Sequence, residues 1–80
     1  MSEKLELFYR AECPYCQKVL RVIDELGVAD AVELRDIHDD DVCQTLIAVG
    51  GKRQVPCLFI DGQPLYESDD IAAWLRSHLA

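Results

Sequence analysis

Several features that mark other classes of protein are missing from this sequence. No stretch of apolar residues approaches the ~20 residues that a membrane-spanning helix needs. The first residues show no basic flank followed by an apolar run, as a signal peptide would. No repeat, linker or low-complexity segment interrupts the chain. We therefore expect a soluble, cytoplasmic protein without a membrane partner.

Positive charge is also scarce. Lys and Arg together number 8 against 15 Asp and Glu, which gives a net charge of −7 at pH 7. Because phosphate neutralisation drives most nucleic-acid binding, a surface this acidic argues against a DNA or RNA partner. A few basic residues still lie in segments that we expect to converge on one site, where they would attract a small anion: Arg10, Lys18, Lys52 and Arg53.

With 80 residues, 50% of them hydrophobic and 29% charged, the chain is expected to form one globular domain over residues 1–80. Alternating apolar positions predict a strand over residues 4–9. A helix is predicted next, with Pro14 just inside its start and Gly27 as its cap. A second strand over residues 31–35 would then pair in parallel with the first.

The second half of the chain predicts a helix, a β-hairpin and a last helix. Three aspartates, residues 39–41, are interpreted as capping and first-turn charges, and Gly50-Gly51 ends that helix. Strands over 56–60 and 63–66 flank the turn signal Asp61-Gly62. Ser68 is the expected N-cap of the last helix. The expected buried stripes of these helices are Val42, Leu46, Ile47 and Val49, then Ile71, Trp74, Leu75 and Leu79. The predicted fold class is α/β, a four-stranded mixed sheet flanked by three helices.

Two of the four cysteines, Cys13 and Cys16, stand one helical turn apart at a strand-to-helix junction. A thiol at a helix N-terminus is stabilised as thiolate by unpaired N–H groups and the helix dipole, so Cys13 is the expected nucleophile. Cys16, at the head of the apolar stripe, is the expected resolving thiol. Glu12, directly before Cys13, would partly offset the stabilisation of the thiolate.

A zinc site is the main alternative for a Cys-x-x-Cys pair, but the second pair of ligands is missing. Cys43 and Cys57 are isolated, and neither His38 nor His78 has ligand spacing. We therefore expect no metal and favour redox chemistry. Cys43 is interpreted as an ordinary helix residue and Cys57 as a buried, inert thiol. Both histidines are interpreted as non-catalytic.

The string Cys13-Pro14-Tyr15-Cys16 resembles the active-site signature of dithiol glutaredoxins. Further matches follow in order along the chain: Arg10 ahead of the nucleophile, Val55-Pro56 before a strand, and Ser68-Asp69-Asp70 at the start of the last helix. The resemblance implies a thioredoxin-like fold, a cis-Pro56 and glutathione as co-substrate. It also implies that glutathione is bound by Arg10, Tyr15, Lys18, Arg53, Gln54, Val55, Pro56, Glu67, Ser68 and Asp69.

The segment Pro64-Leu65-Tyr66-Glu67-Ser68, followed by Ile71, is similar instead to the N-terminal domain of glutathione transferases. In that family a Glu-Ser pair grips the γ-glutamyl group of glutathione. Both resemblances therefore imply glutathione binding.

The resemblance to glutaredoxins implies a monomeric, glutathione-dependent thiol–disulfide oxidoreductase that reduces protein disulfides and glutathionylated proteins through Cys13 and Cys16. An alternative from a different class is a carrier of a glutathione-ligated [2Fe–2S] cluster without turnover, although Pro14 argues against it. A third possibility is an enzyme fed by thioredoxin reductase.

Overall fold

The computed structural model describes residues 4–79; residues 1–3 and 80, which the single-domain expectation includes, lie outside this range. In chain order the elements are β1 (Leu5–Tyr9), α1 (Pro14–Leu26), the 3₁₀ helix η1 (Ala29–Ala31), β2 (Val32–Asp36), α2 (Asp40–Gly50), β3 (Cys57–Ile60), β4 (Gln63–Tyr66) and α3 (Ser68–Leu79). Within the described range, no helix is long and apolar enough to cross a membrane.

The four strands form one mixed sheet in the order β2-β1-β3-β4. β1 runs parallel to β2 and antiparallel to β3, and β3 and β4 form an antiparallel hairpin. Leu7 at the middle of β1 lies opposite Leu34 of β2 and Leu58 of β3. This confirms the predicted α/β class with its parallel β-α-β unit and its hairpin.

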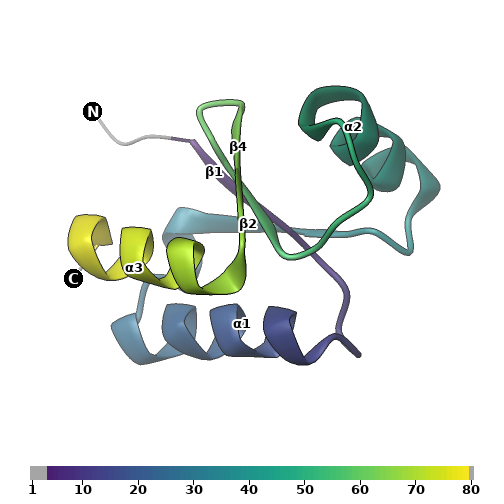
Figure 1. Ribbon diagram of the computed structural model, residues 1–80. Coiled ribbons are helices and arrows are strands. Elements are labelled where there is room, and N and C mark those ends of the chain that lie inside the picture. Colours follow the sequence, from purple (N-terminus) through teal and green to yellow (C-terminus); the bar gives the residue numbers. More distant parts are fainter. Residues whose placement is uncertain (1–3, 80) are drawn as a thin grey trace.

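Helices cover both faces of the sheet (Figure 1): α1 and α3 lie side by side on one face, and α2 lies on the other. The side chains of β1 alternate between the two layers, as its sequence predicts. Leu5 and Leu7 join the larger core under α1 and α3, whereas Phe8 joins a smaller core under α2. The smaller core consists of Phe8, Ile37, Leu46, Cys57 and Phe59.

The ends of the helices follow the local sequence. Pro14 opens α1, and Gly27 closes it in the left-handed conformation, with φ 67°. The side chain of Asp39 caps α2 by accepting a hydrogen bond from the backbone N–H of Asp41 at 3.0 Å. In the hairpin turn Asp61 and Gly62 both have positive φ, 50° and 84°, as a two-residue hairpin loop of this kind requires.

Three kinds of detail differ from the sequence prediction: the ends of strands, the N-cap of α3 and the buried stripe of α2. β1 and β3 begin one residue later than predicted, at Leu5 and Cys57, and β2 ends at Asp36 instead of Arg35. β2 begins at Val32 instead of Ala31, because residues 29–31 form a 3₁₀ turn. Ser68 already lies inside α3, since the Glu67 carbonyl accepts the first helical hydrogen bond from Ile71 at 3.0 Å.

The third difference concerns the buried stripe of α2. Only Leu46 of this helix is buried, whereas Ile47 and Val49 are 37% and 51% exposed. The helix contacts the sheet along a narrow line, so half of the predicted stripe faces outward. In α3, by contrast, Ile71 and Leu75 are buried as predicted, with Trp74 and Leu79 packed partly against the same core.

Candidate active site

Cys13 and Cys16 lie where the chain passes from β1 into α1. The loop before the helix is closed by a hydrogen bond from the backbone N–H of Cys13 to the carbonyl oxygen of Arg10, at 3.1 Å. Cys13 occupies the N-cap position and Cys16 lies in the first turn of α1. Both are free thiols, 6% and 0% exposed respectively. The first thiol therefore stands at the helix N-terminus and the second lies fully inside the protein.

The surroundings of Cys13 favour its ionised form. Burial raises the pKa of the Cys13 thiol, but hydrogen bonds to its sulfur favour the thiolate and more than offset that effect. The donors are the backbone N–H and thiol of Cys16, the backbone N–H of Tyr15 and the side chain of Arg10. The pKa of Cys13 is consequently lower than that of an ordinary cysteine, as expected for a thiol at a helix N-terminus.

The surroundings of Cys16 act in the opposite direction. Burial, together with the hydrogen bond and the negative charge of Cys13, raises the pKa of this thiol to about 11. Two thiols one helical turn apart thus differ in ionisation: Cys13 loses its proton more readily than an ordinary cysteine, and Cys16 less readily.

A groove of about 440 Å³ begins beside this pair. It is lined by residues from three segments, the first turn of α1, the loop before β3 and the start of α3: Tyr15, Gln54, Val55, Pro56, Glu67, Ser68 and Asp69. The Val55–Pro56 peptide bond is cis, as the sequence resemblance implies. Tyr15 is 67% exposed, so its ring is available to a ligand along the groove.

The start of α3 supplies the polar end of the groove. Glu67 has a positive φ of 73° just before the helix, and its carboxylate accepts a hydrogen bond from the Gln54 amide at 3.4 Å. Free N–H groups at the first turn of a helix bind carboxylates, and a neighbouring carboxylate such as that of Asp69 binds an ammonium group. Both kinds of group occur together in a free amino acid or in a γ-glutamyl residue.

Seven of the ten ligand-binding residues named from sequence line this groove, but the three basic ones do not. Lys18 forms an ion pair with Asp69, and thus reaches the groove only through that carboxylate. Arg53 donates a hydrogen bond to the sulfur of Cys43 at 3.4 Å. The side chain of Arg10 donates a hydrogen bond to the sulfur of Cys13. Lys52 lies 4.4 Å from the centre of the Tyr66 ring. None of these four cations lines the groove itself, and each has a partner of its own in this structure.

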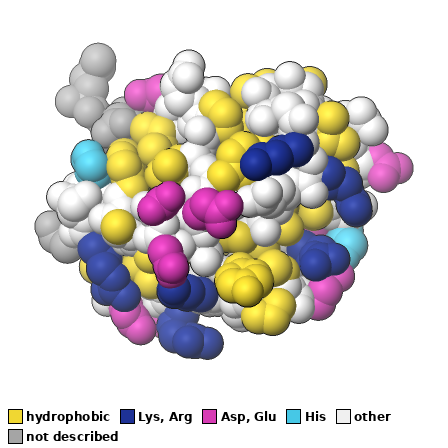
Figure 2. Space-filling model, viewed as in Figure 1, with side chains coloured by type: hydrophobic (Ala, Val, Ile, Leu, Met, Phe, Trp, Pro, Cys, Tyr) yellow, Lys and Arg dark blue, Asp and Glu magenta, His cyan; other side chains and the backbone are white. Residues whose placement is uncertain are grey.

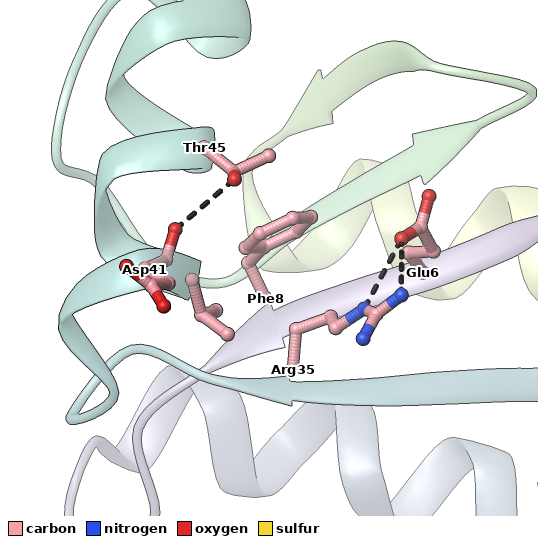
Figure 3. A pocket seen from close by; sticks show the side chains of 6 residues that line it. Glu6, Phe8, Arg35, Asp41 and Thr45 are labelled. Atoms are coloured by element: carbon pink, nitrogen blue, oxygen red, sulfur yellow. Dashed lines mark hydrogen bonds and ion pairs between the residues drawn. The ribbon is translucent and has the colours of Figure 1, made fainter.

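Charged side chains of both signs are mixed over the face shown in Figure 2, without a large patch of one sign. A second hollow of about 250 Å³ lies against β1, β2 and α2 (Figure 3), with the Phe8 ring beneath the helix. Arg35 lines this hollow, and its guanidinium is already paired with Glu6 at 3.0 Å and with Glu33 at 3.2 Å. The guanidinium of this hollow is thus engaged by two carboxylates of the protein itself.

Sequence reasoning missed one residue next to the site. His38 was interpreted as a plain loop residue, but its ring contacts Glu12, which directly precedes Cys13, at 2.9 Å. The two residues are separated by 26 positions, and they meet because β1 and β2 end side by side. The only local signal is the Asp36-x-His38 spacing, which allows a short-range hydrogen bond and says nothing about Glu12.

Comparison with known proteins supports a family assignment. The chain is 41% identical over 71 residues to glutaredoxin-C4 of Arabidopsis thaliana, an alignment that covers 86% of this chain and 53% of that protein. It is 35% identical over 74 residues to a glutaredoxin of Ricinus communis, covering 90% and 72%. The chain belongs to the glutaredoxin family. It spans about half the length of the first two curated relatives that it matches.

Residues 7–79 also match the family model of the glutathione S-transferase N-terminal domain, so this glutaredoxin-family chain belongs to that domain family as well. Among solved structures, it superposes on oxidised glutaredoxin 2 of Chlamydomonas reinhardtii with a TM-score of 0.68 at 25% identity, covering 94% of this chain and 73% of that one. A thioredoxin-like protein gives a TM-score of 0.77 at 23% identity, covering 96% and 100%. The fold is thioredoxin-like.

Within residues 4–79 there is no cluster of three or more His, Cys, Asp or Glu side chains arranged to hold a metal ion. Cys57 is buried, and burial raises its pKa to about 11, which confirms the interpretation of a buried thiol. Cys43, on α2, is partly exposed.

Proposed function

We propose that this protein is a glutathione-dependent thiol–disulfide oxidoreductase in which Cys13 is the attacking thiol and Cys16 the resolving thiol. The observation that carries the proposal is the contrast between the two thiols. The pKa of Cys13 is lowered and that of Cys16 is raised to about 11, beside a groove with polar groups at its far end. Membership of the glutaredoxin family supports the same reaction class.

The proposed reaction begins with a glutathionylated protein. The Cys13 thiolate attacks the glutathione sulfur, the mixed disulfide breaks, and the protein sulfur leaves as a thiolate that takes a proton from solvent. Cys13 is now joined to glutathione by a disulfide. The thiolate of a second glutathione attacks the glutathione sulfur of this disulfide, which forms oxidised glutathione and returns Cys13 as a thiolate.

A dithiol branch reduces protein disulfides. After Cys13 has attacked one sulfur of the substrate disulfide, Cys16 loses its proton and attacks Cys13. The second substrate thiolate leaves with a proton, and a Cys13–Cys16 disulfide forms. Two glutathione molecules then reduce this disulfide in two exchanges. The high pKa of Cys16 keeps this thiol from attacking the substrate disulfide in place of Cys13.

The groove suits glutathione in an extended conformation. In this proposal the backbone of Val55 pairs with the cysteinyl part, and the exposed Tyr15 ring walls one side. Ser68 and the N–H groups of α3 hold the γ-glutamyl carboxylate, and Asp69 holds its ammonium. The remaining residues assigned to glutathione from sequence are Arg10, Lys18, Arg53, Gln54, Pro56 and Glu67.

The proposed partners are glutathione and glutathionylated or disulfide-containing proteins, with the chain acting as a monomer. A cytoplasmic location stays a prediction, since one relative, from Oryza sativa, is named as chloroplastic.

A coupled assay tests this function. It follows NADPH consumption with glutathione, glutathione reductase and a small glutathione mixed disulfide, using the wild-type chain, Cys13→Ser and Cys16→Ser. We expect turnover with the wild type and with Cys16→Ser, because the first branch needs only one thiol of the protein, and none with Cys13→Ser. Turnover that persists in Cys13→Ser overturns the assignment of the nucleophile, and a folded, reduced wild type without turnover overturns the dependence on glutathione.

A further inference from the structure

The ring of His38 bridges two carboxylates from different segments. Its Nε2 lies 2.9 Å from Glu12 Oε2 in the loop before α1, and its Nδ1 lies 2.9 Å from Asp36 Oδ1 at the end of β2. The backbone N–H of His38 also donates to Asp36 Oδ1, at 2.9 Å. A neutral imidazole has one N–H, so it can donate to only one of the two carboxylates. With acceptors at both nitrogens, the geometry fits the doubly protonated imidazolium.

The two segments that His38 joins are also held together by their backbones. The backbone N–H of Ile37 donates to the Tyr9 carbonyl at the end of β1, at 3.0 Å. The position of the ring relative to the loop that carries Cys13 is thus fixed on both sides. Glu12 is the residue directly before Cys13, so its carboxylate belongs to the same short loop that carries the reactive sulfur to the start of α1.

A carboxylate beside a thiol raises the pKa of the thiol, because two negative charges repel each other. An imidazolium on the same carboxylate cancels most of that repulsion. The groups facing the ring are Glu12 and Asp36; Arg10 adds a positive charge near Glu12, and Asp39 is occupied as the cap of α2.

The ionisation of the pair is consistent with this arrangement. Hydrogen bonding and charge from Glu12, then from Asp36, raise the pKa of His38. The pKa of Glu12 is lowered, first by its own backbone N–H and then by His38, against an opposing effect of burial. The imidazolium and carboxylate forms therefore coexist over a wider pH range than in separate side chains.

We propose that His38 is a positioning residue for Cys13, which holds the Glu12 carboxylate in an ion pair and thereby weakens the effect of that carboxylate on the thiolate. The proposal rests on the assignment of Cys13 as the attacking thiol. His38 itself touches neither substrate nor sulfur in this mechanism, and it acts only through Glu12. Its effect must therefore disappear when Glu12 carries no charge.

The test is a double-mutant cycle on the reduced full-length chain with His38→Gln, Glu12→Gln and the double variant. The rate of Cys13 alkylation by iodoacetamide is measured from pH 5 to 9, with peptide mass spectrometry to assign the modified cysteine. We expect His38→Gln to shift the Cys13 titration to higher pH and to slow alkylation at pH 6 by about threefold, the size typical of an exposed charge at short range. In the presence of Glu12→Gln, the same His38→Gln change should have no effect.

His78→Gln is the matched control, because this second histidine lies at the end of α3, stacked on Trp74. It should leave the Cys13 titration unchanged. An equal effect of His38→Gln with and without Glu12→Gln would overturn the proposal, since His38 would then act on Cys13 directly or through the fold. No effect in either background would also overturn it.

A second readout does not depend on the cysteine. The pKa of the His38 ring, followed by NMR in the wild type, should lie above that of a free histidine and fall in Glu12→Gln. An unchanged ring pKa would contradict the proposal even if a cycle variant were unstable. Both readouts are made without glutathione, so loss of the coupling and failure of the glutathione-dependent reaction are separate results.

Discussion

At the scale of single residues, the four cysteines fall into three kinds that differ in pKa and exposure. Cys13 has a lowered pKa, Cys16 and Cys57 have pKa values raised to about 11 by burial, and Cys43 lies partly exposed on α2. The difference arises because hydrogen bonds outweigh burial at Cys13, whereas burial outweighs the hydrogen bonds at Cys16 and Cys57. The thiol with the lowered pKa is thus selected by its position and not by its exposure, which is only 6%.

Cys57 gives a prediction about alkaline pH. Burial raises its pKa in the folded protein to about 11, from an unfolded value of about 8.5. A group with a raised folded pKa contributes stability below its unfolded pKa and loses that contribution as pH rises towards the folded value. Between pH 8.5 and 11 the free energy of unfolding should therefore fall, by about 2–3 kcal/mol on account of this thiol.

Urea denaturation at several pH values measures this fall. Cys57→Ala should show a shallower decline than the wild type, because it has no thiol to ionise on unfolding. Cys43→Ala, at a partly exposed position, serves as the control and should decline like the wild type. A Cys57→Ala slope equal to that of the wild type would show that this thiol does not contribute.

At the scale of elements, the end of α2 is fitted closely to β4. A Cβ at Gly50 would overlap the hydroxyl of Tyr66. That hydroxyl donates to the Lys52 carbonyl oxygen at 3.3 Å, which keeps the ring over the loop that leaves the helix. Glycine at this position is thus required by the neighbouring strand, in addition to marking the helix end.

Gly50→Ala should destabilise the protein by about 1–3 kcal/mol, the usual cost of overpacking a fitted contact. The loss should be smaller when Gly50→Ala is combined with Tyr66→Phe, which removes the overlapping oxygen. Chemical denaturation of the two single variants and the double variant measures both effects. Additive losses would mean that the contact between α2 and β4 is not the cause.

Most of the helix ends and the hairpin turn were predictable from sequence, because the residues that determine them are local. Proline at the start of α1, Asp39 at the start of α2 and Asp61-Gly62 in the hairpin each set their own backbone conformation. The buried face of α2 was not predictable to the same extent. Its apolar residues spread around the helix, and only contact with the sheet decides that Leu46 is buried and Val49 is not.

The residues of the candidate site also divide into those that the sequence predicts and those that it does not. Cys13, Cys16 and the residues around the groove follow from a local motif and from matches to a known family. The partners of the basic residues and of His38 could not be read from sequence, because Lys18 and Asp69 are separated by 51 positions and Glu12 and His38 by 26. Such pairs depend on the packing of whole elements against each other.

At the scale of the whole molecule, the two sides of the sheet are held unequally. The core under α1 and α3 contains ten buried residues, whereas the core under α2 contains five, of which Leu46 alone comes from the helix. Local opening is favoured where few buried contacts hold an element. Helix α2 is therefore the element we expect to open first.

Native-state hydrogen exchange tests this expectation. Amides of α2 should exchange at least tenfold faster than those of β1 and α1, because opening α2 exposes only the smaller core. Comparable protection of the amides in α2, β1 and α1 would contradict the expectation that α2 opens first. Leu46→Ala should increase exchange in α2 with little change in α1, while Ile47→Ala, on the exposed side of the same helix, should change neither.

The central claim is that Cys13 is the thiol that exchanges with glutathione disulfides. The most direct measurement is to mix the reduced Cys16→Ser chain with oxidised glutathione near neutral pH and to locate the adduct by peptide mass spectrometry. Without the resolving thiol, the mixed disulfide should accumulate, with one glutathione per chain, on Cys13. An adduct on the partly exposed Cys43 alone, or no adduct on a folded chain, would contradict the account.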